Sequence, residues 1–290
     1  MRPGARNRAL ITAVTAVTAL LLAAAPAAMA GVVLPERGGS PNADDISTLY
    51  SITLYVAIVI FVGVEGTLIW ALVRFRRRRG GAPPAQIRGN TPLEIGWTVG
   101  AAVIVLALAV ITFVYLPDIK NPPRSGPNGL QASGSVELAA INQTAPPGGE
   151  VLEIGVNGQQ YLWRYDYPGK EQLFSYHEMV VPTDTTVTLK ITSQDVAHSW
   201  WIPKLGGKAD ALPGHTNETW FKISKPGLYE GQCAELCGDN HADMRAAVRA
   251  VPPAEFEAWA REQRADIQDA RDGLAAQRRF RERQAGGEDQ

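Results

Sequence analysis

Residues 231–244 read GQCAELCGDNHADM, and this stretch is the strongest indication of both fold and chemistry. Cys233 and Cys237 are the only two cysteines among 290 residues, and His241 and Met244 follow them closely. A further histidine, His198, lies upstream. Thiolate and thioether sulfurs are soft ligands that favour copper, and imidazole suits several transition metals. The stretch therefore predicts a metal-binding loop.

Other interpretations of the cysteine pair stay open at this point. Paired cysteines in an oxidising compartment form a disulfide by default, although a disulfide leaves His241 and Met244 without a role. Zinc also binds cysteine and histidine but has little use for methionine. A copper-delivery protein of the thioredoxin-like class uses Cys-x3-Cys with a distant histidine. In that class proline follows the second cysteine, whereas Gly238 follows Cys237 here.

A pair of copper ions bridged by both thiolates accounts for every donor. A single-copper electron-transfer site needs one cysteine, two histidines and a weak axial methionine, and this chain has one thiolate more. If both sulfurs bridge two ions, each ion needs only one histidine and one weak axial donor. Met244 can serve one ion, and a loop carbonyl such as that of Glu235 can serve the other. Such a pair shares one electron over two metals, which suits electron transfer.

Three apolar runs before residue 117 predict an exported protein anchored in the cell membrane. Residues 1–30 have the arginines, apolar run and small-residue cleavage site of a signal peptide, with an uncleaved anchor as the alternative. Residues 52–73 and 95–116 can each cross a hydrocarbon core of ~30 Å at about 1.5 Å per residue. Six arginines lie between positions 74 and 88, so this loop is predicted to be cytoplasmic. The C-terminal domain is therefore expected to be extracytoplasmic.

Residues 118–253 predict a β-sandwich or barrel, because short apolar stretches alternate with turn signals such as Asn157-Gly158. The expected strands cover residues 151–156, 159–167, 187–191, 219–223, 228–231 and the region around Val248. Residues 31–117 form an N-terminal segment with the transmembrane hairpin, and residues 254–290 a charged helical or disordered tail. The net charge of −1 supplies no basic field for nucleic acid.

Together these motifs resemble subunit II of cytochrome c oxidase over about residues 46–252. The resemblance rests on Asp195-Val196-Ala197-His198-Ser199-Trp200 with Ile202-Pro203, on residues 208–214, and on residues 231–244. It implies an α+β membrane protein, with a two-helix transmembrane hairpin followed by an all-β, cupredoxin-like Greek-key sandwich. It also implies a binuclear copper A centre and a magnesium ion, shared with subunit I, on the Glu235 carboxylate. The implied copper ligands are His198, Cys233, Cys237, His241, Met244 and the Glu235 carbonyl.

The resemblance also implies a function and partners. The chain is expected to accept electrons from a c-type cytochrome, free or within a supercomplex, and to pass them to haem a of subunit I in an aa3-type oxidase. Haem a3 and CuB of subunit I then reduce oxygen to water while protons are pumped, and subunit III completes the assembly. The chain is not expected to be catalytic alone.

Three further residues take expected roles from the resemblance. Tyr161 stands where the family usually has the tryptophan that receives electrons, so Tyr161 and Trp163 are the candidates for electron uptake, with core packing as the alternative for Trp163. Glu94 matches a family glutamate at the cytoplasmic mouth of a proton pathway. Glu65 is a carboxylate within the first span, and the resemblance assigns it no role.

Two functions outside an oxidase remain as alternatives. One is the electron-accepting domain of a nitrous oxide reductase, which a propeller would be expected to precede. The other is a copper-binding electron carrier or copper delivery protein. The sequence contains no Cys-x-x-Cys-His motif, which excludes the variants with a fused haem domain. Co-purification with a haem-containing subunit distinguishes these functions.

Overall fold

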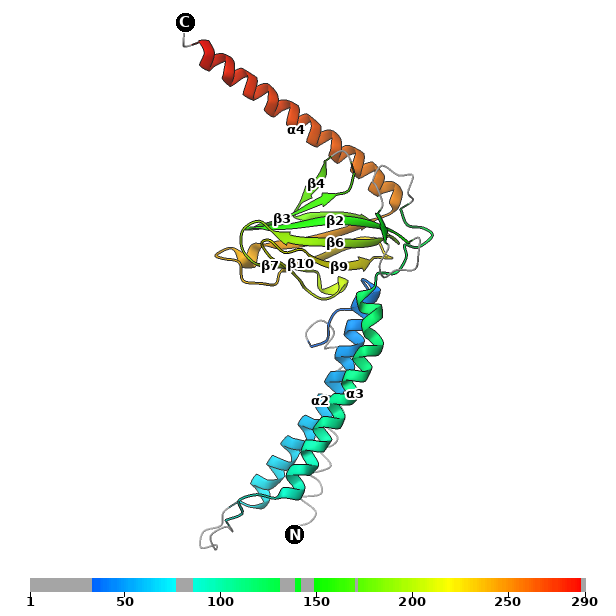
Figure 1. The fold of residues 1–290 in the computed structure, drawn as a ribbon, viewed down its shortest axis with the longest axis vertical. Coiled ribbons are helices and arrows are strands. Elements are labelled where there is room, and N and C mark those ends of the chain that lie inside the picture. The colour runs from blue at the N-terminus through cyan, green and yellow to red at the C-terminus, as the bar shows by residue number, and fades with distance from the viewer. Residues whose placement is uncertain (1–32, 77–85, 131–138, 142–148, 170–171, 288–290) are drawn as a thin grey trace, which may run out of the picture. The chain divides into compact units, whose positions relative to one another are not determined.

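The computed structural model describes residues 33–76, 86–130, 139–141, 149–169 and 172–287 (Figure 1). The predicted signal peptide and the centre of the arginine-rich loop lie outside these residues. The chain divides into two compact units. The described residues up to 36 and residues 47–112 form the first unit, while residues 37–46 and the described residues from 113 onward form the second.

The first unit is built from two long apolar helices. α2 spans Pro41–Arg74 and α3 spans Thr91–Lys120, so the two predicted spans lie within them. Both are long and apolar enough to cross a membrane. A helix suits this environment because hydrocarbon offers the backbone no hydrogen-bonding partners. α3 begins at a cap, since Asn90 Oδ1 accepts the Leu93 N–H and Glu94 Oε1 accepts the Asn90 N–H.

The second unit is a two-layer β-sandwich followed by a helix (Figure 1). One sheet has the order β4-β3-β2-β6-β9, with β1 paired to β2, and the other has the order β5-β11-β10-β7-β8. The α+β class, with an apolar helical pair followed by a sandwich, is therefore confirmed. The strands are β1 Ala139–Ile141, β2 Gly149–Gln159, β3 Leu162–Tyr167, β4 Leu173–Tyr176, β5 Glu178–Pro182, β6 Thr186–Ser193, β7 His198–Trp201, β8 Ala209–Ala211, β9 Asn217–Lys222, β10 Gly227–Cys233 and β11 Arg245–Val251.

Alternation along the strands places one face of each sheet in the core. On β3, Trp163, Tyr165 and Tyr167 are buried, while Arg164 and Asp166 between them form an ion pair of 2.7 Å on the other face. Successive side chains of a strand point to opposite faces, so this pattern follows directly from the sequence.

One predicted turn is wrong. Asn157-Gly158 does not end a strand, because β2 continues to Gln159 and the reversal falls at residues 160–161. Gly158 pairs with Trp163 on one side and Ser193 on the other. A Cβ at this position would lie 3.1 Å from atoms of both His198 and Trp163. The glycine therefore serves close packing within a sheet and not a turn.

The C-terminal segment forms helix α4, Pro253–Gly287. Proline is well tolerated at the first helical position. Phe256, Ala260 and Ile267 are buried, and the Trp259 ring lies 5.1 Å from that of Tyr167. The predicted tail is thus helical as far as Gly287, while the predicted domain boundaries stay predictions.

The ends of the two apolar helices are seated on the sandwich within the second unit. The Asn42 side chain donates to the Trp220 carbonyl at 2.8 Å, and Trp220 Nε1 donates to the Ile119 carbonyl at 2.9 Å. These bonds attach the start of α2 and the end of α3 to β9.

Candidate metal centre

The predicted ligands converge at one rim of the sandwich because two strands and one loop meet there. His198 begins β7 and Cys233 ends β10, and the two strands are antiparallel neighbours. The loop after Cys233 returns through a short 3-10 turn, His241–Asp243, to β11. Its two ends are joined by the bond from the Cys233 N–H to the Met244 carbonyl, 2.9 Å. The Ala234 N–H adds a bond of 2.8 Å to the Ser199 carbonyl.

Each cysteine sulfur has one imidazole and one weaker donor beside it. Cys233 Sγ lies 3.9 Å from His198 Nδ1 and 3.2 Å from the Glu235 carbonyl oxygen. Cys237 Sγ lies 3.5 Å from His241 Nδ1 and 3.8 Å from Met244 Sδ. The donors of His198, Cys233 and Cys237 all lie within 4.8 Å of one another. The arrangement is thus two parallel sets of thiolate, imidazole and axial donor.

The two sulfurs are placed for a shared metal and not for a disulfide. Both cysteines are free, and their sulfurs are 3.9 Å apart, against about 2.05 Å in a disulfide. That separation is less than twice a zinc–thiolate bond of about 2.3 Å, so one ion of similar size can contact both sulfurs. Burial and, to a lesser degree, the neighbouring Cys233 together raise the pKa of the Cys237 thiol to about 11. A metal must therefore displace a proton when it binds.

The centre is buried except on one side. His198, Cys233, Cys237 and Met244 are all buried. His241 is only half-buried and the Glu235 side chain is exposed. The sulfurs are therefore shielded from water, while one ligand edge reaches the surface.

Asp195 is a residue of the site to which the sequence analysis assigned no role. Its Oδ1 lies 2.8 Å from His198 Nε2, which leaves Nδ1 directed at Cys233. Such a bond orients a ligand histidine and selects its tautomer. Burial of Asp195 opposes ionisation, but hydrogen bonds from His198, from the Gln160 and Val196 N–H groups and from the Ser193 hydroxyl lower its pKa to about 2. The sequence signal for this role is a carboxylate three residues before His198, the first predicted ligand histidine.

Comparisons with known proteins agree with this geometry. A family model described as the transmembrane domain of cytochrome c oxidase subunit II matches residues 27–114, and one described as its periplasmic domain matches residues 169–251. The subunit 2 protein of Synechocystis sp. is 34% identical, covering 76% of this chain and 73% of that protein. The chain belongs to the cytochrome c oxidase subunit II family.

Other relatives differ in how much of their length is matched. The subunit 2 protein of Alkalihalophilus pseudofirmus is 31% identical over 82% of this chain, and the chain spans 64% of that protein. Among solved structures, the periplasmic domain of cytochrome oxidase subunit II from Bradyrhizobium japonicum is 37% identical. The match covers 40% of this chain and 94% of that one, with a TM-score of 0.39.

Membership of the subunit II family confirms the predicted membrane topology and the predicted oxidase family, and it supports part of the predicted copper site. The chain is a membrane protein with two spanning helices and an extracytoplasmic C-terminal domain. The family is named for cytochrome c oxidase, which is an oxidoreductase complex. The family implies a copper A centre, and His198, Cys233 and Cys237 can hold it.

Of the two aromatic residues predicted for electron uptake, Tyr161 lies in the β2–β3 turn and Trp163 lies on β3. Trp163 is fully buried, and its ring packs edge-on against His198 with centroids 5.9 Å apart. Among the described residues its Nε1 has no hydrogen-bond partner. Tyr161 is half-buried, and its hydroxyl accepts the Asp239 N–H at 3.0 Å. Both therefore contact segments that carry the predicted copper ligands.

The two ends of Glu235 face different surroundings. Its carbonyl is turned towards Cys233, whereas its carboxylate lies at the surface, 3.8 Å from Lys208 Nζ. Lys208 also bonds Asp210 at 2.9 Å, and Asp210 accepts the Ser199 hydroxyl. The carboxylate predicted for magnesium thus shares Lys208 with a second carboxylate.

Glu94 belongs to the first unit, where it is exposed and caps the start of α3. The structure therefore gives it a local role in capping the start of α3, beside the proton-pathway role that the family resemblance implies.

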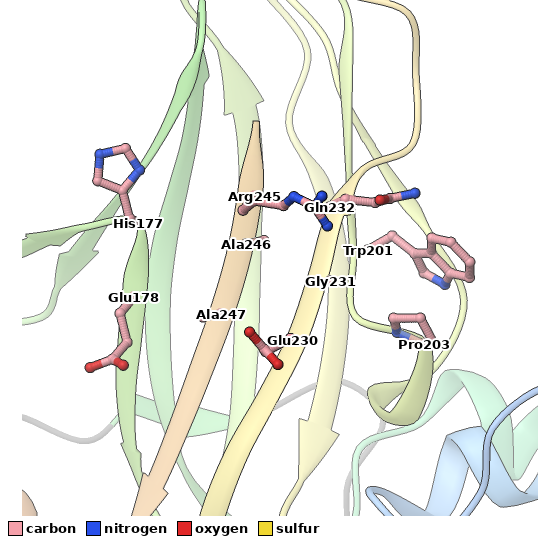
Figure 2. Close-up of a pocket in the computed structure, with 10 residues that line it drawn as sticks. All are labelled: His177, Glu178, Trp201, Pro203, Glu230, Gly231, Gln232, Arg245, Ala246 and Ala247. Carbon is pink, nitrogen blue, oxygen red and sulfur yellow. The ribbon is translucent and has the colours of Figure 1, made fainter. Parts of the chain in front are cut away.

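A groove of about 530 Å³ lies on the face of the five-stranded sheet that points away from the ligands (Figure 2). It is lined by residues including His177, Glu178, Gln232 and Arg245. Gln232 and Arg245 are chain neighbours of Cys233 and Met244, and strand alternation turns them to the opposite face. The predicted ligands do not line this groove.

Proposed function

We propose that this chain is the electron-accepting subunit II of an aa3-type cytochrome c oxidase. It receives single electrons from a c-type cytochrome and passes them to haem a of subunit I. The supporting observation is the pair of free, buried sulfurs 3.9 Å apart, each with its own imidazole. A disulfide or a zinc site would not need two such matched donor sets.

The proposed copper ligands divide into two sets that share both sulfurs. His198 and the Glu235 carbonyl lie beside Cys233, and His241 and Met244 lie beside Cys237. Soft sulfur donors with a weak axial ligand are typical of copper electron-transfer sites. When bound, the copper pair supplies a reversible one-electron store. The protein supplies a site shielded from water and held by two backbone bonds, one across the loop and one from the loop to β7.

Electron uptake is proposed at Tyr161 and Trp163. Tyr161 is partly exposed and bonded to the ligand loop, and Trp163 lies against His198. Tyr161 thus offers a partly exposed ring beside the ligand loop, and Trp163 offers a buried ring against a proposed ligand. His241, the half-buried ligand, is the accessible edge of the centre.

The Glu235 carboxylate is proposed to bind a magnesium ion shared with subunit I. Magnesium prefers carboxylate oxygen and keeps several waters, so an exposed carboxylate is suitable. The nearby Asp210 is a second source of oxygen donors.

Glu94 is proposed as the entrance of the proton pathway in subunit I. Its support is an exposed carboxylate at the start of α3, just after the arginine-rich loop. The proposed partners are subunit I, with haem a, haem a3 and CuB, subunit III and the lipid bilayer.

The test is to purify the full-length chain with its membrane assembly and to measure copper, haem and the electron paramagnetic resonance spectrum. We expect two copper ions per chain and hyperfine coupling to two nuclei. One copper with a single-nucleus spectrum refutes the binuclear centre, and absence of a haem-containing partner favours a copper carrier.

A matched pair of methionine variants tests the ligand assignment. Met244→Leu should alter the copper spectrum, because it removes a proposed axial donor. Met179→Leu is the control, since Met179 is equally buried but lies on β5, away from the centre. Equal spectra for the two variants would remove Met244 from the ligand set.

A further inference from the structure

The turn between β2 and β3 contacts both segments that carry the proposed ligands. The Gln160 N–H donates to Asp195 Oδ2 at 2.7 Å, and Gln160 Nε2 donates to the Cys237 carbonyl at 2.7 Å. The Tyr161 hydroxyl accepts the Asp239 N–H at 3.0 Å. Two adjacent residues therefore make three hydrogen bonds to segments that lie far along the chain.

The first of these bonds leads to His198. Asp195 receives Gln160 on one carboxylate oxygen and faces His198 Nε2 with the other, at 2.8 Å. A carboxylate held at both oxygens has little freedom to rotate, so it fixes the imidazole plane. The turn thus orients His198 through Asp195.

The other two bonds hold the loop on both sides of Gly238. The Cys237 carbonyl precedes this glycine and the Asp239 N–H follows it, and Gly238 has a φ of 128°. A Cβ at position 238 would lie 2.5 Å from the Tyr161 hydroxyl and 2.9 Å from Gln160 Nε2. Glycine therefore permits both the backbone conformation and the close approach of the turn. These two bonds therefore hold the backbone of the segment that links the predicted ligands Cys237 and His241.

We propose that Gln160 and Tyr161 form a clamp that positions the ligands of the copper loop. The proposal rests on the copper centre proposed above. The clamp joins the His198 side of the centre to the Cys237 side without using the metal. Both residues are positioning residues, since they act through Asp195 and through the loop backbone.

The Tyr161 hydroxyl is the acceptor on which the bond from Asp239 depends. A tryptophan at this position would carry an indole N–H, which donates and cannot accept a backbone N–H. Tyrosine supplies the acceptor that Asp239 needs. Tyrosine therefore combines a loop anchor with a partly exposed aromatic ring beside the ligand loop.

The test compares Tyr161→Phe, Tyr161→Trp and Gln160→Met in the full-length chain within its membrane assembly. Each removes one hydrogen bond to the loop and adds no charge. The readout is the rate at which a copper(I) chelator, bathocuproine disulfonate, removes copper, followed by loss of the copper signal. We expect each variant to lose copper about 2- to 12-fold faster, the range for loss of one hydrogen bond.

The matched control is Tyr229→Phe. The Tyr229 hydroxyl also bonds a backbone group, the Lys225 carbonyl at 2.9 Å, but near the far end of β10. A general loss of stability would appear in this variant too, whereas a clamp effect would not. The hyperfine spectrum gives a second readout, and it should shift in the Gln160 and Tyr161 variants only.

The outcomes separate this inference from the proposed function. If the wild-type chain holds no copper pair, both are wrong. If the wild type holds the pair and all three clamp variants lose copper at the rate of Tyr229→Phe, the clamp alone is overturned. Should Tyr161→Phe fail to accumulate, Gln160→Met carries the test, because its long apolar side chain replaces the amide without changing the ring.

Discussion

The Tyr167 hydroxyl joins the two sheets by bonding both backbone groups of Val180, so removal of this hydroxyl should lower the free energy of unfolding substantially. Its hydroxyl donates to the Val180 carbonyl at 2.9 Å and accepts the Val180 N–H at 2.8 Å. Val180 lies on β5, which pairs with β11 on its other side, while Tyr167 lies on β3 of the opposite sheet. Burial raises the pKa of Tyr167, so the hydroxyl stays protonated and performs both tasks.

Tyr167→Phe would leave two buried backbone groups unpaired at once. An unpaired buried group costs about 1–3 kcal/mol, so the expected loss of unfolding free energy for two groups is about 2–6 kcal/mol. That is a large part of the roughly 5–15 kcal/mol of a typical domain. Part of the ring packing against Phe256 and Trp259 should survive, since phenylalanine keeps the ring.

The assay is urea unfolding of a soluble fragment, residues 118–287, which retains α4. Tyr229→Phe is the control, because its hydroxyl makes one bond in a partly exposed setting and should cost about 1 kcal/mol or less. The copper spectrum of folded Tyr167→Phe should be unchanged. Equal urea midpoints for Tyr167→Phe and Tyr229→Phe would show that the hydrogen bonds between the sheets stabilise the domain no more than one partly exposed bond does.

Three further outcomes are expected. Cys233→Ser should reduce copper to one ion or none, as metal analysis would show, whereas loss of a merely structural disulfide would cost about 2–5 kcal/mol of stability with no spectral change. Hydrogen bonds lower the folded pKa of Asp195 from 3.8 to about 2, so its contribution to stability is present above pH 4 and is lost as the pH falls through 2. Asp195→Asn should therefore weaken the fall of unfolding free energy with falling pH, as measured by urea unfolding of the metal-free protein at several pH values. Glu94→Gln should slow proton uptake by the assembled oxidase while leaving the copper spectrum intact, and an altered spectrum would contradict its assignment to the proton pathway.

Much of the site could be predicted because its chemistry is local. Cys233, Cys237, His241 and Met244 lie in one short stretch, and their atom types restrict the metal without knowledge of the fold. The apolar helices were equally predictable, since length and hydropathy follow directly from composition. Several strands were found from alternation, including the aromatic strand that became β3.

Other elements escaped because their sequence signals are weak or ambiguous. β7 and β8 have four and three residues, too few to show a period. Asn157-Gly158 has the composition of a turn, yet tertiary packing of His198 and Trp163 against Gly158 requires a glycine inside a strand. A glycine that close packing requires within a strand can thus be mistaken for a turn residue in the sequence.

The sequence alone determined the kinds of donor, the membrane anchor and the sandwich that follows it, because each depends on residues that are neighbours in the chain. Only the tertiary structure decided that the sulfurs stand 3.9 Å apart, that Asp195 orients His198, and that Gln160 and Tyr161 hold the loop. These contacts join strands whose separation in space is set by sheet pairing, and no local pattern encodes that pairing.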